Sequence, residues 1–336
     1  MMNAQMIRPI RDDIGFCWNA EQMDTLISYL NRTETESPFP AQGLVAGISP
    51  HDDYLYAAKV YYPLYRLIQA DEIVIFGVTH GTVRSVMNDP RDVLIFDDFP
   101  DWHGPYGKVA VSPLRNDVFN NLPTGERLLS DQAQTIEHSI EALIPFLQYY
   151  NRNVRLTPIM VTGMSFNRMD SLSTDLAQII ARYMKTHDLQ AGKDIFFLIS
   201  ADLNHYGGDF NNTPFGDDAK AHHTGTVNDQ RIAHEAIGGR LTLEKVRLLT
   251  EELWSDLPGK PAHPLWCGQY SIPFGLLTTM KIINQISGKS LEGEIFRYSD
   301  TWTGGVLPVE RTSLGITAPF SLKHWVGFMS AGLYLQ

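Results

Sequence analysis

The fold is decided by the stretch EIVIFGVTHG at residues 72–81, in which a short apolar run ends in a polar corner that carries His80. Short apolar runs bounded by turn residues are typical of buried strands. The same order recurs after Gly43–Ser49, which leads to His51, and after Asp194–Ser200, which leads to His205. The sequence therefore predicts several strands of one sheet, three of which end beside a histidine.

Longer amphipathic stretches alternate with these runs, which is the pattern of βαβ units on a largely parallel or mixed sheet. The predicted strands are Gly43–Ser49, Glu72–Gly77, Asp92–Phe96, Val154–Val161 and Asp194–Ser200. The predicted helices are Ala20–Leu30, Asp53–Gln69, Thr135–Tyr149, Phe166–Thr186, Asp217–Ile237, Leu243–Glu252 and Ser271–Ser287. The segment Glu292–Gln336 is predicted to be rich in strands, with a turn at Gly304–Gly305.

The chain of 336 residues contains no internal repeat or long linker. We therefore predict a single α/β domain over residues 1–336, with a helical excursion near residues 208–265.

Composition excludes several classes of protein. The formal net charge is −11 and no basic run occurs, which argues against nucleic acid and anionic membranes as partners. Two cysteines, Cys17 and Cys267, exclude a disulfide scaffold and favour a reducing compartment. No run approaches the ~20 apolar residues that span a bilayer. We expect a cytoplasmic protein.

The three corner histidines, His51, His80 and His205, are the first candidates for a functional site. Ligands bind outside the carboxyl ends of strands in open α/β sheets. A lone loop histidine is usually only solvated or hydrogen-bonded. Three at equivalent corners, with neighbouring strands about 5 Å apart, are expected to converge as in a metal or general-base site. Imidazole suits iron, zinc, copper and nickel alike, so the residue type does not choose the metal.

A fourth histidine, His138, lies in the stretch TIEHSIEALIP at residues 135–145, whose apolar spacing predicts a helix. His138 and Glu141 are three residues apart and fall together on the opposite face. They are either a solvent-facing pair or part of the site, where Glu141 would orient His138 as an acid or base. Pro145 ends or kinks this helix, so only its first turns are expected.

Cys267 precedes the predicted helix Ser271–Ser287. Its position leaves two alternatives equally open. It is a small buried hydrophobe, or its thiolate is stabilised near a helix N-terminus and serves as a soft metal ligand or redox group. Cys17 lies between two aromatic residues and is expected in the core. Asp52-Asp53, directly after His51, are candidates for ligands or for acceptors behind the ligands.

Several blocks of the chain occur together in one order. They are Pro50-His51 with Tyr54, Gly77-Val78-Thr79-His80, Glu137-His138-Ser139-Ile140-Glu141, the segment from Ser200 to Gly207, and Cys267-Gly268. In order and rough spacing they resemble the Memo family, whose prokaryotic members are labelled AmmeMemoRadiSam system protein B. The resemblance covers nearly the whole chain.

The resemblance implies a three-layer α/β/α domain similar in fold to the LigB-type class III extradiol dioxygenases, with a non-haem iron at the carboxyl edge of the sheet. It assigns metal-ligand roles to His51, His80 and Cys267. It implies catalytic roles in the same pocket for His205, His138, Asp202 and Glu141.

Two departures from these relatives affect the expected chemistry. Asp52-Asp53 stand where the family usually has Ala-Gly, which adds negative charge beside the predicted metal. Cys267 takes the position of the glutamate ligand of ring-cleaving enzymes, and a thiolate is a poorer match to ordinary catechol cleavage.

The leading hypothesis is an oxidoreductase that binds Fe(II), with copper as a competitor, and carries out O2-dependent or other redox chemistry on a small organic substrate. His205 or His138 would move protons. The alternatives are a zinc-type hydrolase that uses the same residues, and a non-catalytic scaffold that binds a peptide or partner protein. Family gene organisation also suggests a radical-SAM protein and an AMMECR-type protein as partners.

Overall fold

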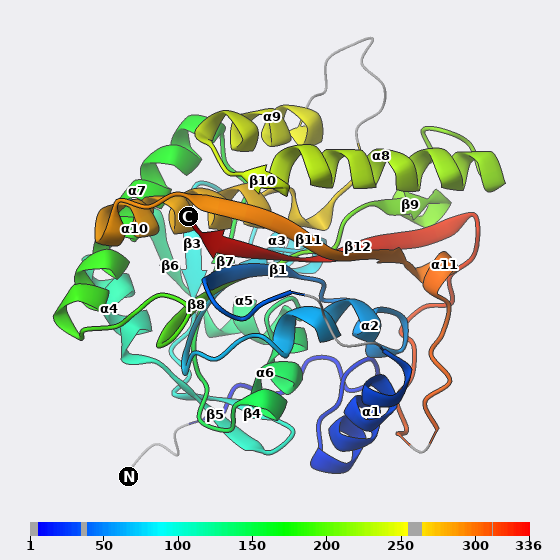
Figure 1. The fold of residues 1–336 in the computed structure, drawn as a ribbon, viewed down its shortest axis with the longest axis horizontal. Helices are drawn as coiled ribbons and strands as arrows, with labels where there is room; N and C mark the ends of the chain where they lie inside the picture. Colours follow the sequence, from blue (N-terminus) through cyan, green and yellow to red (C-terminus); the bar gives the residue numbers. More distant parts are fainter. Residues whose placement is uncertain (1–5, 35–38, 255–263, 311) are drawn as a thin grey trace.

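The computed structural model describes residues 6–34, 39–254, 264–310 and 312–336. A twelve-stranded mixed sheet runs through these residues, and its main path has the order β10-β11-β12-β1-β8-β2-β7-β3-β6 (Figure 1). The strands are β1 Leu44–Ser49, β2 Glu72–Val78, β3 Leu94–Phe96, β4 Asp101–Gly104, β5 Gly107–Val111, β6 Arg127–Leu129, β7 Arg155–Val161, β8 Ile195–Ser200, β9 His205–Gly207, β10 Gly239–Arg240, β11 Leu291–Asp300 and β12 His324–Leu335.

The central four strands, β1, β8, β2 and β7, are parallel. Their registers align Ser49 of β1 with Ser200 of β8, and Phe76 of β2 with Ile199 of β8. The strands are buried along almost their whole length, as expected for apolar runs with helices on both faces. Because they are parallel and in register, their carboxyl ends meet at one edge of the sheet.

Antiparallel strands complete the sheet on both sides, so the sheet is mixed. β12 pairs with β1 and with β11, which confirms the strand-rich C-terminal segment. On the other side β3 is antiparallel to β7. The hairpin of β4 and β5 was not predicted from the sequence.

Helices cover both faces, which confirms the α/β/α architecture. α7, α8, α9 and α10 contribute to one apolar core, whereas α1, α2 and α6 contribute to the other (Figure 1). Within β2, Val74 and Phe76 belong to the first core, and Ile73 and Ile75 to the second. The helices are α1 Ala20–Thr33, α2 Tyr54–Tyr65, α3 Gly81–Val86, α4 Pro113–Asn121, α5 Asp131–Ile136, α6 Ile144–Tyr150, α7 Phe166–Thr186, α8 Ala219–Ile237, α9 Leu243–Trp254, α10 Ser271–Ser287 and α11 Thr301–Gly304.

The prediction of one helix over Thr135–Tyr149 is wrong. α5 ends at Ile136, a turn follows, and a 3-10 turn at Glu141–Leu143 precedes α6. The helix breaks because the Glu137 carboxylate accepts hydrogen bonds from the backbone N–H groups of His138 and Ser139. These two bonds replace helical ones, and they fix a bend at the carboxyl edge of the sheet.

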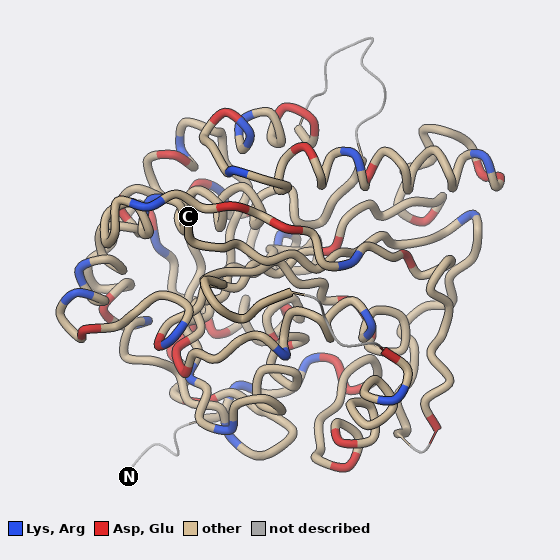
Figure 2. The backbone as a smooth tube through the Cα atoms, viewed as in Figure 1, with Lys and Arg blue, Asp and Glu red and all other residues tan. Residues whose placement is uncertain are grey.

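The predicted excursion near residues 208–265 contains α8 and α9, and α8 packs on β11 and β12. Residues 255–263 of this segment lie outside the described part of the chain. Among the described helices, none is long and apolar enough to cross a membrane. Lys and Arg residues are interspersed with acidic ones along the chain (Figure 2).

Candidate metal centre

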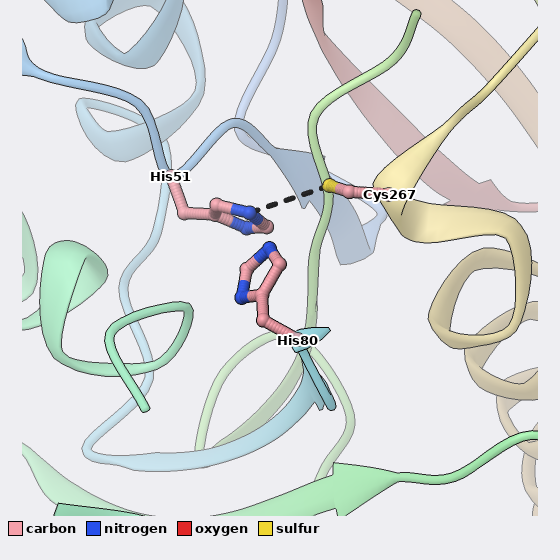
Figure 3. Close-up of side chains that lie close together, drawn as sticks. All are labelled: His51, His80 and Cys267. Carbon is pink, nitrogen blue, oxygen red and sulfur yellow. Dashed lines mark hydrogen bonds between the residues drawn. The ribbon is translucent and has the colours of Figure 1, made fainter. Parts of the chain in front are cut away.

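Three segments that are far apart in sequence meet at the carboxyl edge of the sheet. His51 follows β1, His80 follows β2, and Cys267 begins a 3-10 turn ahead of α10. One donor atom from each lies within 4.8 Å of the donor atoms of the other two. Figure 3 shows the side chains of His80 and Cys267 approaching the His51 imidazole from different elements. The structure thus brings together the three residues that the resemblance assigned to a metal.

His51 is buried and presents one ring nitrogen to this cluster. Its Nδ1 is 2.8 Å from the Ser200 hydroxyl oxygen, and its backbone N–H donates to Asp202. The opposite ring atom, Nε2, lies 3.3 Å from Cys267 Sγ (Figure 3). Two donors that share a tetrahedral ion with Zn–N near 2.0 Å and Zn–S near 2.3 Å are roughly 3.5 Å apart. The observed separation therefore fits a pair of ligands to one ion.

His51 is also held in the neutral form that a metal requires. Burial, together with the nearby His80 and His138, lowers the pKa of His51 well below its ordinary value. A neutral imidazole keeps its lone pair free for coordination.

His80 is oriented by Glu137. The Glu137 carboxylate lies 2.7 Å from Nδ1 of His80 and also accepts the His80 backbone N–H. Burial alone would lower the pKa of His80, but the Glu137 carboxylate outweighs it and raises that pKa. Burial opposes ionisation of Glu137 as well, yet His80 and the hydrogen bonds hold the Glu137 pKa well below its usual range. A carboxylate behind a histidine ligand fixes the ring and leaves Nε2 for a metal.

Sequence reasoning missed Glu137, although it directly precedes His138. It is buried beneath two histidines, where an unpaired carboxylate would be costly. The only sequence signal was its place in the EHSIE block.

Cys267 is held against the loop that follows β8. Its sulfur accepts the Asp202 backbone N–H at 3.1 Å and lies 3.3 Å from the Asp202 carbonyl oxygen. Gly268 permits this approach, because a Cβ there would lie 2.3 Å from the Ala201 Cβ. Burial and the Asp202 carboxylate raise the pKa of the Cys267 thiol well above its ordinary value. A cation is what would stabilise its thiolate at this position.

His138 and His205 border the same cluster. The His138 ring stacks on His80, with ring centroids 4.7 Å apart. His205 directs Nδ1 to the Leu203 carbonyl oxygen at 3.1 Å, and one of its ring nitrogens lies within 4.8 Å of the Cys267 sulfur. Burial lowers the pKa of both imidazoles to about 4. Both rings are therefore neutral at physiological pH.

A family model described as "Memo-like protein" matches residues 17–301. The chain belongs to the Memo family. Two relatives, each described as "MEMO1 family protein", illustrate the relationship. The protein from Pyrobaculum arsenaticum is 27% identical over 193 residues, which is 55% of this chain and 62% of the relative. The protein from Methanococcoides burtonii is 30% identical over 169 residues, which is 49% of this chain and 56% of the relative. The chain thus spans about three fifths of the length of these curated relatives.

In this Memo-family chain the acid beside His138 is Glu137, and the predicted pairing of Glu141 with His138 is not what the structure contains. Glu141 is buried and forms an ion pair with Arg8. It also accepts the backbone N–H groups of Arg11 and Asp12. These contacts turn Glu141 away from His138 and let it anchor the N-terminal segment behind the site.

Asp202 lies on the side of the His51 ring that faces the cluster. One of its oxygens accepts the His51 backbone N–H, and the other lies 3.4 Å from His51 Nε2. Burial raises the pKa of Asp202 to about 7. Asp202, His205 and Cys267 also form a second group whose donor atoms lie within 4.8 Å of one another.

The two aspartates after His51 differ in role. Asp53 accepts hydrogen bonds from the backbone N–H and hydroxyl of Thr317, and burial raises its pKa to about 6. It therefore ties the C-terminal loop to the start of α2. Asp52 lines the open side of the cluster, and burial and Asp202 raise its pKa well above its usual range. Neither belongs to a metal-binding group among the described residues.

Two cavities border the cluster. One, of about 190 Å³, is lined by His80, His205 and Cys267. The other, of about 410 Å³, is lined by His51, His80, His138 and His205, together with Asp12, Asp52, Asp53 and Asp202. A bound ion would thus have ligands on the protein side and space on the other sides.

Proposed function

We propose that this protein binds iron through His51, His80 and Cys267, with copper as a competitor, and that it is a metal-dependent oxidoreductase acting on a small organic molecule. The observation that carries the proposal is the convergence within 4.8 Å of two imidazoles from the ends of β1 and β2 and a thiol from the 3-10 turn ahead of α10. The likeness of the Memo family to LigB-type dioxygenases supports iron, and the mixed nitrogen and sulfur donors suit iron and copper.

The chain's own residues have separable tasks in this proposal. Glu137 and Ser200 fix the ring orientations of His80 and His51 through Nδ1. His138 and His205 border the cavities and are placed to accept or deliver a proton. A bound metal would supply Lewis acidity and, for iron or copper, electrons for reaction with O2.

The test is anaerobic reconstitution with Fe(II), removal of loose metal, and measurement of metal content and O2 uptake with candidate phenols. We expect about one tightly held iron per chain in the wild type, and its loss in His51→Ala and Cys267→Ala. His103→Ala is the matched control, since this histidine is exposed on β4. A wild type that retains no metal, or equal retention in all variants, would contradict the proposal.

A zinc-type hydrolase is the second candidate. It is favoured by the donor set itself, because catalytic zinc sites use three nitrogen, sulfur or oxygen ligands from the protein and keep the fourth tetrahedral position open. Bound zinc lowers the pKa of a water to about 7. This candidate predicts one zinc per chain and an activity that does not depend on O2.

A further inference from the structure

The smaller of the two cavities differs from the larger one in its lining. Its walls are largely apolar and aromatic, with contributions from Val78, Val161, Phe210, Trp266 and Tyr270. His80 and Cys267 form the side that faces the proposed metal centre. The cavity therefore offers a ligand both an apolar surface and access to the reactive cluster.

The two cavities also differ in charge. Among the described residues, no aspartate or glutamate lines the smaller cavity, whereas four aspartates line the larger one. The smaller cavity is lined by one arginine, Arg84. A Cβ built on Gly81 would lie 3.8 Å from Arg84 Nη2, so the guanidinium lies over the start of α3 next to His80. The Arg84 guanidinium is thus at the same end of the smaller cavity as His80.

Most other polar groups of the lining are already satisfied. The Thr79 hydroxyl donates to the Val161 carbonyl oxygen, and the Ser271 hydroxyl donates to that of Ser200. Within the described residues, the side chains of Arg84 and Gln269 and the Tyr270 hydroxyl form no hydrogen bond. These three side chains are therefore available to bind a polar part of a ligand, and of the three only Arg84 carries a charge.

We propose that this cavity binds the substrate and that the substrate is a ring-sized, mostly apolar carboxylate. This assignment rests on the proposed function, because it places the ligand beside His80 and Cys267. The size follows from the volume: an apolar cavity of about 150 Å³ accepts benzene, and this one measures about 190 Å³. The carboxylate pairs with the planar Arg84 guanidinium, and the Gln269 amide supplies a further hydrogen bond. One cation matches one carboxylate better than a phosphate dianion.

Benzoate, benzamide and benzylamine are the probes, because they share a ring and differ in charge. Binding is measured by calorimetry or ligand-detected NMR on both the metal-free and the iron-loaded full chain. We expect benzoate to bind about tenfold or more tightly than the other two, and Arg84→Gln to abolish that preference. Arg11→Gln is the matched control, because Arg11 lines the larger cavity. That variant should leave the preference unchanged.

Three results would overturn the inference: no binding of benzoate, no preference for it over benzamide, or a preference that is lost in Arg11→Gln instead. The last result would locate the anion in the larger cavity. Failure of the proposed function is separate, because it appears as absent metal. Benzoate binding that depends on Arg84 in metal-free protein would then still support the cavity assignment.

Discussion

Replacing Glu137 by Gln removes the charge behind His80 with almost no change of shape. The carboxylate accepts four hydrogen bonds, from the His80 ring, the His80 backbone N–H, and the backbone N–H groups of His138 and Ser139. A glutamine can place its oxygen toward only part of this set. Its amide group must then face another donor, which leaves a buried N–H unsatisfied.

These contacts set the expected losses of stability and of metal affinity in Glu137→Gln. Loss of a buried hydrogen bond to a charged group costs about 1.5–3 kcal/mol of unfolding free energy. Loss of a partner behind a metal ligand typically lowers metal affinity about 10- to 100-fold. We therefore expect Glu137→Gln to lose stability and to bind Fe(II) or Zn(II) about 10- to 100-fold more weakly.

The assay is competition with a chelator of known affinity, alongside urea unfolding of the metal-free protein. Glu126→Gln is the control, since Glu126 is also buried but pairs with Arg168 away from the site. It should lose stability without losing metal affinity. Wild-type metal affinity in Glu137→Gln would refute the assigned role of Glu137.

Two further predictions concern stability and local packing. Asp229 is buried against Trp266, and burial raises its folded pKa to about 7. The folded state therefore holds a proton that the unfolded state releases near pH 4. Protonated Asp229 therefore contributes fully to the free energy of unfolding below about pH 4. This contribution of roughly 4 kcal/mol is lost as the pH rises from about 4 through 7. Asp229→Asn should remove this pH-dependent loss of stability. Urea unfolding between about pH 4 and pH 8 measures it, and a pH dependence of stability unchanged by Asp229→Asn would contradict the burial argument. Gly268→Ala should lower the free energy of unfolding by about 1–3 kcal/mol and weaken metal binding. Gly125→Ala is the control, because a Cβ at Gly125 would meet open space, and it should change neither stability nor metal binding. Equal effects of the two substitutions would contradict the close approach at Gly268.

The sequence predicted the central strands and their polar corners because these depend on local patterns. Apolar runs such as residues 72–78 form strands that are buried on both faces, and parallel strands necessarily end at one edge. The proximity of His51 and His80 follows from that geometry. Cys267 required the family resemblance, since its position alone left a structural role equally open.

The sequence did not predict which distant groups the buried glutamates contact. Glu137 bonds to His80, which is 57 residues away, and the same carboxylate caps the bend at His138 and Ser139 where apolar spacing predicted a helix. Glu141 was expected on a face beside His138, but its partner Arg8 is more than a hundred residues away. No local periodicity encodes which buried acid will meet which distant donor.

The most direct test of the proposed metal centre is anomalous scattering at the iron edge from crystals of the Fe(II)-reconstituted protein, grown without chelator. We expect one strong peak bounded by His51 Nε2, the free ring nitrogen of His80 and Cys267 Sγ. Iron bound elsewhere, or a reconstituted protein that retains iron with this cluster empty, would contradict it.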